Sequence, residues 1–237
     1  AFPVLLKERL AALLPHIGLW VLYGMTEGGV PAVLRPDEQI LKPTSVGRPL
    51  PGVEIRLVDE AGADAAQGDS GEVLLRSGAP GQAMVAREYF DRPEVNRETY
   101  KNGWFSTGDV GRFDEDGYLY LVDRVKDMIV SGGLNIYSRE VELVLESAPA
   151  VREVVVVAGP DKDFGECVVA YVALKPGHEA NLEVLIAHCR NYIAGYKKPK
   201  YVFILESLPR NVNGKAMKSD LRARAPQDIA DASIDRC

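Results

Sequence analysis

Hydrophobic residues recur at helical spacing in the first part of the chain, and the pattern then changes. Residues 4–14 carry leucines three and four positions apart, which predicts a helix that packs through one face. The leucines of this face are Leu6, Leu10, Leu13 and Leu14. The apolar run 19–23 predicts a short buried strand that leads into a glycine-bearing loop. Because loops at strand ends expose their side chains, we expect Thr26 and Glu27 to face a ligand.

Between residues 46 and 122 the pattern consists of short apolar runs separated by turn residues. Strands are predicted at 53–58, 72–76 and 118–122. The intervening turns are predicted at 59–62, 68–71 and 114–117. A short helix near 93–100 interrupts the strands, since proline is tolerated in a first helical turn. These elements predict a small, largely antiparallel sheet or barrel.

Beyond residue 123 the predicted order becomes strand, helix, strand, strand, helix, strand. The helices are predicted at 139–147 and 182–192, and the central strands at 151–158 and 167–174. A compact α+β domain of about a hundred residues fits this order. A boundary at 123–126 divides the chain into residues 1–124 and 125–237, and residues 226–237 are expected to form a frayed tail.

Composition and charge restrict the class of protein. The chain has 237 residues, of which 46% are hydrophobic and 26% charged, which is typical of a soluble globular protein. A formal net charge of −6 argues against nonspecific nucleic-acid binding. The three cysteines form no CxxC pair and the three histidines have no metal-ligand spacing, so we expect neither a disulfide framework nor structural zinc.

The apolar start of the chain does not have the pattern of a membrane segment. Lys7, Glu8 and Arg9 interrupt residues 1–22, and Pro15 interrupts them again. This pattern indicates neither a membrane span nor a signal peptide, so the cytoplasm is the expected location.

Two polar segments have side chains that suit a nucleotide. In residues 23–27, a carboxylate beside a hydroxyl can bind a hard cation and a phosphate oxygen, whereas taken alone so short a motif is more simply explained as a capped turn. In residues 106–109, an apolar strand is expected to deliver Asp109 to an exposed turn. Its two carboxylate oxygens match the two hydroxyls of a ribose. A local turn that Asp109 caps with its own side chain is the alternative.

The segment 123–142 is the longest of these polar stretches. Arg124 offers planar donors to ribose or phosphate oxygens, and Gly132 and Gly133 allow a ligand or another backbone to approach closely. Ser138 is expected to cap the helix that follows. Taken alone, Lys126 is a solvated charge at a strand edge.

Lys215 stands on a glycine-containing loop, followed by a short basic helix with spaced leucines. A bare ammonium there can offset charge that grows on an α-phosphate during attack by a carboxylate. An exposed surface lysine is the alternative. Gly214 and Lys215 do not form a P-loop, because Ala216 follows them. The other basic residues of this region either meet a phosphate-bearing ligand or are simply solvated.

These four segments, in this order, resemble the adenylate-forming superfamily, in its AMP-forming acyl-CoA synthetase branch. The resemblance runs from about residue 23 to residue 222. Ser138 stands where proline is usual, Asp123 where glycine is frequent, and Asn211 where threonine is common. The resemblance implies an α+β fold, made of the end of a large domain with a small antiparallel β-barrel-like subdomain and then a small mobile domain.

The resemblance also implies roles for individual residues. Tyr23 would face adenine, Thr26 would contact phosphate, Glu27 would hold magnesium, Asp109 and Arg124 would bind the ribose, Lys126 would be the interdomain hinge, Gly132 and Gly133 would border the pantetheine tunnel, and Lys215 would be catalytic.

The activity implied is that of an acid–thiol ligase, with ATP, Mg²⁺ and coenzyme A as cofactors. A carboxylic acid, fatty or aromatic, would attack ATP to form acyl-AMP, and coenzyme A would then displace AMP. The earlier phosphate loop and most of the acyl pocket are missing, so we expect a fragment whose partner is the N-terminal part of the same enzyme and which alone is inactive in adenylation. A homo-oligomer is compatible with the sequence. A carrier-protein-loading adenylation domain and a noncatalytic nucleotide-binding module are the alternatives.

Overall fold

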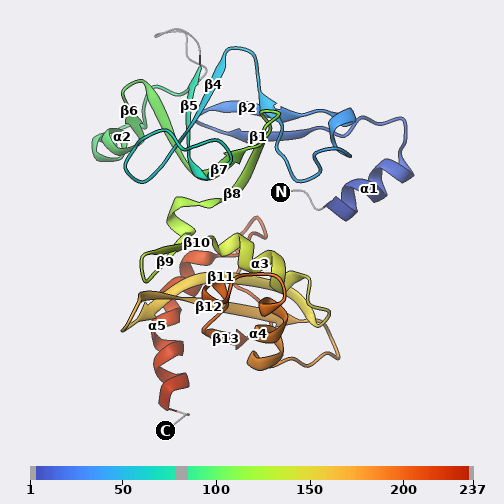
Figure 1. The fold of residues 1–237 in the computed structure, drawn as a ribbon, viewed down its shortest axis with the longest axis vertical. Helices are drawn as coiled ribbons and strands as arrows, with labels where there is room; N and C mark the ends of the chain where they lie inside the picture. The colour runs from blue at the N-terminus through green and yellow to red at the C-terminus, as the bar shows by residue number, and fades with distance from the viewer. Residues whose placement is uncertain (1–3, 78–84, 235–237) are drawn as a thin grey trace. The chain divides into compact units, whose positions relative to one another are not determined.

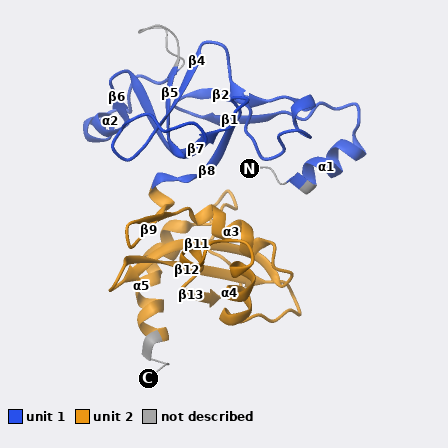
Figure 2. Cartoon of the chain, viewed as in Figure 1, with its two compact units in different colours: residues 1–125 blue, residues 126–237 orange. Residues whose placement is uncertain are grey.

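The chain forms two compact units. A computed structural model describes residues 4–77 and 85–234, and the units comprise residues 1–125 and 126–237 (Figures 1 and 2). Both units contain helices and antiparallel strand pairs, which confirms the predicted α+β class. No helix in the described part of the chain combines the length and the apolar character needed to cross a bilayer.

The first unit begins with a helix and a three-stranded sheet. α1 (Val4–Leu13) precedes β1 (Val21–Met25), β2 (Gly29–Leu34), the 3₁₀ turn η1 (Pro36–Glu38) and β3 (Arg48–Pro49), and the sheet order is β1-β2-β3. The α1 helix was predicted, but packing through its leucines was wrong, since Leu13 is 72% exposed. Lys7 of α1 is buried, and its ammonium donates to the Pro43 carbonyl at 2.7 Å.

β1 differs from the buried strand that was predicted. Tyr23 is buried, whereas the neighbouring Leu22 is exposed. β1 therefore follows the alternation of a strand with one buried face.

A second, five-stranded sheet completes the first unit. Its elements are β4 (Val53–Val58), β5 (Gly71–Ser77), α2 (Pro93–Thr99), β6 (Tyr100–Lys101), β7 (Trp104–Phe113) and β8 (Leu119–Arg124). The strand order is β4-β5-β7-β6, with β8 also paired to β7, and every pairing is antiparallel. Val73, Leu75, Phe105 and Leu119 form its core together with Tyr23 of the first sheet, which joins the two sheets into one body.

The second unit is built around two long central strands. Its elements are η2 (Val125–Asp127, beginning at the boundary), β9 (Ile129–Ser131), β10 (Leu134–Ile136), α3 (Ser138–Glu146), β11 (Val151–Asp161), β12 (Gly165–Leu174), α4 (Leu182–Arg190), η3 (Gly195–Lys197), β13 (Tyr201–Ile204) and α5 (Lys218–Ile234). The sheet order is β10-β9-β12-β11, and β13 pairs with β12 in parallel.

β11 and β12 are apolar along most of their length because both faces of this sheet are covered. One face packs against α3 and α4 through Val154, Val156, Val168, Ala170 and Val172. The other face packs against α5 through Val155, Val157, Val169, Tyr171 and Ala173. Strands that are buried on both sides read as continuous apolar runs, which is why the sequence located them well.

The expectation of a frayed tail from residue 226 was wrong for the described residues. α5 continues through Pro226 to Ile234. Leu221 and Ala225 are buried against the sheet and Ile229 packs beside them, a spacing of four that keeps one helix face on the core. The Tyr171 hydroxyl also donates to Asp228 at 2.8 Å.

Ser138 does not cap α3 as predicted. The helix includes Ser138, and the Ser138 hydroxyl instead accepts from the Lys218 ammonium at 2.6 Å. The same ammonium lies 2.8 Å from the Glu142 carboxylate, which also accepts from the Val156 amide at 3.0 Å. The first residue of α5 is therefore anchored to α3 by a largely buried ion pair.

We expect Lys218→Met to destabilise the second unit by about 1–3 kcal/mol, because it leaves the 5%-exposed Glu142 side chain without its main cation. Amide exchange at Val156 and thermal unfolding by circular dichroism measure the loss. Lys197→Met is the matched control. Its partner Glu140 has a 35%-exposed side chain, so we expect at most about 1 kcal/mol. Equal losses for the two variants would refute a special role for the Glu142 pair.

Candidate functional site

Asp109 lies inside a long strand, not in the exposed turn that was predicted. Across β5 and β7, Glu72 pairs with Val110 whereas Leu74 pairs with Ser106, so β7 holds extra residues between these positions. Gly108 has φ = 69°, the left-handed conformation that favours glycine. Such a bulge bends a strand and redirects a side chain. β7 therefore presents Asp109 from its middle.

Asp109 is held by two other strands. The Tyr23 hydroxyl of β1 donates to Asp109 Oδ2 at 2.8 Å, and Arg124 Nε of β8 donates to Asp109 Oδ1 at 2.7 Å. Asp109 and Arg124 are also directly opposite each other in the β7–β8 register. Three residues predicted to bind a nucleotide are thus joined in one network.

The Tyr23 hydroxyl remains a hydrogen-bond donor at neutral pH. Tyr23 is 6% exposed, and burial, followed by the Asp109 carboxylate, raises the pKa of its phenol well above the usual value. A protonated phenol and a guanidinium both donate to Asp109. Their bonds hold the carboxylate in one orientation and leave its oxygens further acceptor capacity.

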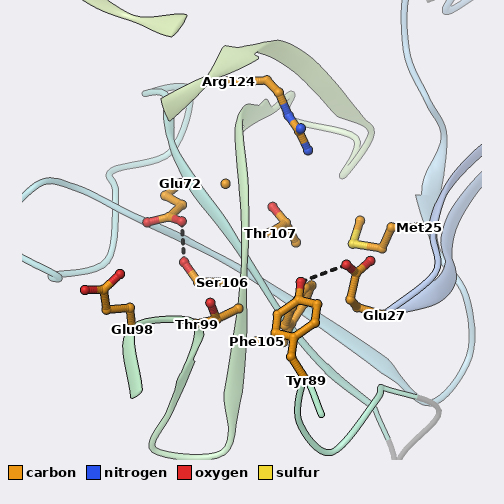
Figure 3. Close-up of a pocket in the computed structure, with 11 residues that line it drawn as sticks. Met25, Glu27, Glu72, Tyr89, Glu98, Thr99, Phe105, Ser106, Thr107 and Arg124 are labelled. Carbon is orange, nitrogen blue, oxygen red and sulfur yellow. Dashed lines mark hydrogen bonds between the residues drawn. The ribbon is translucent and has the colours of Figure 1, made fainter. Parts of the chain in front are cut away.

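A hollow of about 430 Å³ adjoins this network in the first unit. Arg124, Thr107 and Gly108 line it together with Glu27 and Phe105 (Figure 3). Its other lining residues are Met25, Glu72, Tyr89, Glu98, Thr99 and Ser106. Glu27 and Arg124, both predicted as ligand-binding residues, therefore lie in the wall of the same hollow.

Glu27 lies in the turn between β1 and β2, and one of its oxygens is already occupied. The Tyr89 hydroxyl donates to Glu27 Oε1 at 2.7 Å (Figure 3). Burial, followed by the Glu27 carboxylate, raises the pKa of Tyr89 to about 12, so this phenol also stays protonated at neutral pH. Within the described ranges, Glu27 Oε2 makes no hydrogen bond.

The residues present suit a magnesium ion that is held together with a nucleotide. Mg²⁺ takes oxygen ligands and is commonly held by one or two carboxylates plus substrate phosphates. Glu27 supplies one such carboxylate, and Thr26 beside it is exposed. Among residues 4–77 and 85–234, no group of three or more His, Cys, Asp or Glu side chains could form a metal cage from protein ligands alone.

The remaining predicted residues belong to the second unit. Lys126 is its first residue and is exposed within the η2 turn. Gly132 has φ = 59° and its amide donates to the Phe164 carbonyl at 2.9 Å. The positive φ favours glycine here, and a Cβ atom at Gly132 would lie 2.9 Å from the exposed Phe164 ring, which would have to shift. Gly133, at φ = 78°, faces open space.

Lys215 is exposed at the end of a tight turn. Asn211 Oδ1 accepts from the amides of Asn213 and Lys215, at 3.0 and 2.9 Å, and so closes the turn. The Lys215 ammonium makes no hydrogen bond or ion pair within the described part of the chain. It is therefore available to an anionic ligand.

Sequence reasoning missed Tyr89, Glu72 and Ser106 as lining residues of the hollow. The Ser106 hydroxyl donates to the Glu72 carboxylate across β5 and β7. The alternation of β5 marks Glu72 as one of its polar positions, but pairing with Ser106 depends on the bulge. Tyr89 precedes α2 in an irregular segment, and no local pattern signals its contact with Glu27.

Comparison with known proteins gives the family. A family model described as "AMP-binding enzyme" matches residues 1–90, and one described as "AMP-binding enzyme C-terminal domain" matches residues 140–215. Together the two matches cover more than half of the chain. The chain belongs to the AMP-binding enzyme family. This membership confirms the resemblance to adenylate-forming enzymes.

Two relatives illustrate the range of thiol acceptors. The 3-[(3aS,4S,7aS)-7a-methyl-1,5-dioxo-octahydro-1H-inden-4-yl]propanoyl:CoA ligase of Rhodococcus jostii is 39% identical, over 94% of this chain and 41% of its own. The fatty acid–[acyl-carrier-protein] ligase ScoC of Streptomyces coeruleorubidus is also 39% identical, over 95% of this chain and 43% of its own. The chain thus spans about two fifths of the length of the relatives it matches.

A solved structure shares the same fold. The o-succinylbenzoate CoA synthetase MenE of Bacillus subtilis, in complex with the acyl-adenylate OSB-AMP, is 35% identical with a TM-score of 0.80. The match covers 93% of this chain and 44% of MenE. Another structure of MenE contains ATP and a magnesium ion.

The Asp109 network can be tested by its energetics. We expect Asp109→Ala to destabilise the first unit by about 1–3 kcal/mol, because it leaves the Tyr23 hydroxyl buried without its acceptor. The double variant carries Asp109→Ala and Tyr23→Phe. We expect its loss in free energy of unfolding to be smaller than the sum of the losses in the two single variants, by about 1 kcal/mol.

Tryptophan fluorescence during urea unfolding measures these losses, since both tryptophans, Trp20 and Trp104, lie in the first unit. Strict additivity of the two substitutions would show that the hydroxyl and the carboxylate do not interact energetically.

Proposed function

We propose that the whole protein is an AMP-forming acyl-CoA synthetase. A carboxylic acid attacks the α-phosphate of ATP, which forms acyl-AMP and releases pyrophosphate. The thiol of coenzyme A then attacks the acyl carbon and displaces AMP, which yields the thioester. The observation that carries this proposal is the network in which Tyr23 and Arg124 orient Asp109 beside the hollow lined by Glu27, in a chain of the AMP-binding family.

In this proposal the first unit binds the nucleotide. The Asp109 carboxylate accepts from the two ribose hydroxyls, while Arg124 donates to ribose or phosphate oxygens. Tyr23 is 6% exposed, so its part in this proposal is to keep Asp109 in place through its hydroxyl. The exposed Thr26 hydroxyl contacts a phosphate oxygen. These contacts bind ATP in one orientation, which brings the α-phosphate close to the acid.

Glu27 would hold the Mg²⁺ that accompanies ATP. When bound there, the ion would offset negative charge on the phosphates. Glu27 would contribute an oxygen ligand from the β1–β2 turn through Oε2, because Oε1 accepts from Tyr89.

The second unit supplies the catalytic cation. The Lys215 ammonium, which the Asn211 turn leaves exposed, stabilises the charge that grows on the α-phosphate and the attacking carboxylate. This role needs a fixed positive charge and no proton transfer. Rotation about Lys126 then moves Lys215 away from the acyl-adenylate and brings Gly132 and Gly133 towards it. Because these two residues lack side chains, pantetheine can pass beside them.

The thiol acceptor has two candidates. Coenzyme A is our first choice, because the R. jostii relative and MenE are both CoA ligases. A pantetheine tethered to a carrier protein is the second, and the equally similar acyl-carrier-protein ligase ScoC favours it. Incubating the whole protein with acyl-AMP and either free CoA or a loaded carrier protein separates the two.

The rest of the enzyme would complete the site. Because the relatives are more than twice as long as this chain, we propose that their additional length corresponds to the phosphate loop and the acyl pocket. The acid, ATP and CoA are then the small-molecule partners, and the cytoplasm is the proposed location.

We expect Lys215→Ala in the whole protein to slow ATP–pyrophosphate exchange by at least about a hundredfold, since it removes charge stabilisation from the adenylation step. Thioester formation from supplied acyl-AMP should be largely spared. Lys101→Ala, at another exposed lysine, is the control and should leave both half-reactions unchanged. Equal loss of both half-reactions in Lys215→Ala would contradict this role. The absence of any exchange in the wild type would favour a noncatalytic nucleotide-binding module.

A further inference from the structure

The segment before α2 is held against Glu27 at two points. The Ala86 amide donates to the Glu27 main-chain carbonyl, and the Tyr89 hydroxyl donates to Glu27 Oε1 at 2.7 Å. Main chain and side chain of Glu27 are therefore both bound by residues about sixty positions further along the chain. This double contact fixes the turn that carries the carboxylate, and Figure 3 shows the bond from Tyr89 to the Glu27 side chain.

Tyr89 is itself held firmly. Asn96 of α2 accepts from the Tyr89 amide at 2.7 Å and donates to the Tyr89 carbonyl at 2.8 Å. The Tyr89 ring meets the Tyr100 ring edge to face, with centroids 6.1 Å apart, and Tyr100 packs on Phe105 at 5.1 Å. The phenol therefore extends from a backbone and a ring that have little freedom to move.

The bond from Tyr89 restricts Glu27 without neutralising it. A hydrogen bond from a neutral phenol to a carboxylate is charge-assisted, so it is stronger than a neutral pair. It occupies one lone pair of Oε1 and leaves Oε2 to a cation. Partners of this kind around metal ligands commonly fix ligand orientation and raise metal affinity.

We propose that Tyr89 is a positioning residue for Glu27, which holds this carboxylate in the orientation that binds the divalent cation of the nucleotide. The proposal rests on the function proposed above for Glu27. It adds a residue from a different segment, and through Asn96 it makes α2 part of the support of the site.

The chain offers a matched pair of variants. Tyr89→Phe removes the hydroxyl that bonds Glu27, while Tyr100→Phe removes a buried hydroxyl that has no partner among the described residues. The two rings touch each other, so the two substitutions are made in the same surroundings. Removing an unpaired buried hydroxyl is expected to leave folding unaffected or improve it.

The experiment measures divalent-ion affinity in the whole protein. Mn²⁺ binding in the presence of ATP is followed by electron paramagnetic resonance, and the Mg²⁺ dependence of ATP–pyrophosphate exchange is titrated in parallel. We expect Tyr89→Phe to weaken Mn²⁺ binding and to raise the half-saturating Mg²⁺ concentration, each by roughly tenfold. Tyr100→Phe should leave both at the wild-type value.

Two further variants separate the outcomes. Glu27→Gln should weaken Mn²⁺ binding more than Tyr89→Phe; if it has no effect, the proposed metal role of Glu27 fails and the role of Tyr89 fails with it. Suppose that Glu27→Gln weakens Mn²⁺ binding. If Tyr89→Phe then behaves like Tyr100→Phe, or lowers only the maximal rate of ATP–pyrophosphate exchange, the positioning role of Tyr89 alone is overturned. Should Tyr89→Phe fold poorly, Asn96→Ala loosens the same support and should weaken Mn²⁺ binding in the same direction, and wild-type affinity there would count against the proposal.

Discussion

Fixing one carboxylate in the middle of a strand is the constraint on which the first unit's site depends. The bulge in β7 lies next to Asp109, and Tyr23 from β1 and Arg124 from β8 bind the two oxygens of its carboxylate. Hydrogen bonds to Asp109 thereby connect strands of both sheets at the proposed ligand-binding site. An unpaired buried phenol or carboxylate would be costly, so each member of the network holds the others. Arg124 is also the last residue of β8, and Val125 alone separates it from Lys126, the proposed pivot.

The proposed pivot and the loop proposed to be catalytic both belong to the second unit. Arg222 of α5 is ion-paired at 2.8 Å to Asp127, the residue after Lys126. Lys218, at the start of the same helix, is bound to Glu142 of α3. Because α5 follows the Lys215 loop directly, movement of the chain at Lys126 would carry Lys215 with it. Under the proposed function, a backbone rotation at Lys126 would therefore move the second unit as one body.

The sequence predicted the parts whose signals are local. The apolar runs of β11 and β12 were found because both faces are buried, and the exposed loop of Lys215 because a glycine-containing turn stands out. Features that depend on distant residues were missed. The bulge that carries Asp109 follows from the β5–β7 register, and the Tyr89–Glu27 bond joins residues 62 positions apart. α5 continues past Pro226 because the burial of its apolar face stabilises the helix by more than the proline destabilises it.

Nucleotide binding by the first unit depends on recognition of ribose by Asp109. Calorimetric titration of the whole protein with AMP and with 2′,3′-dideoxy-AMP tests it, since the two nucleotides differ only in the hydroxyls that the carboxylate would accept from. We expect AMP to bind at least about tenfold more tightly, because two hydrogen bonds to a charged group are gained, and we expect Asp109→Asn to remove most of this preference. Equal affinity of the wild-type protein for the two nucleotides would contradict the account.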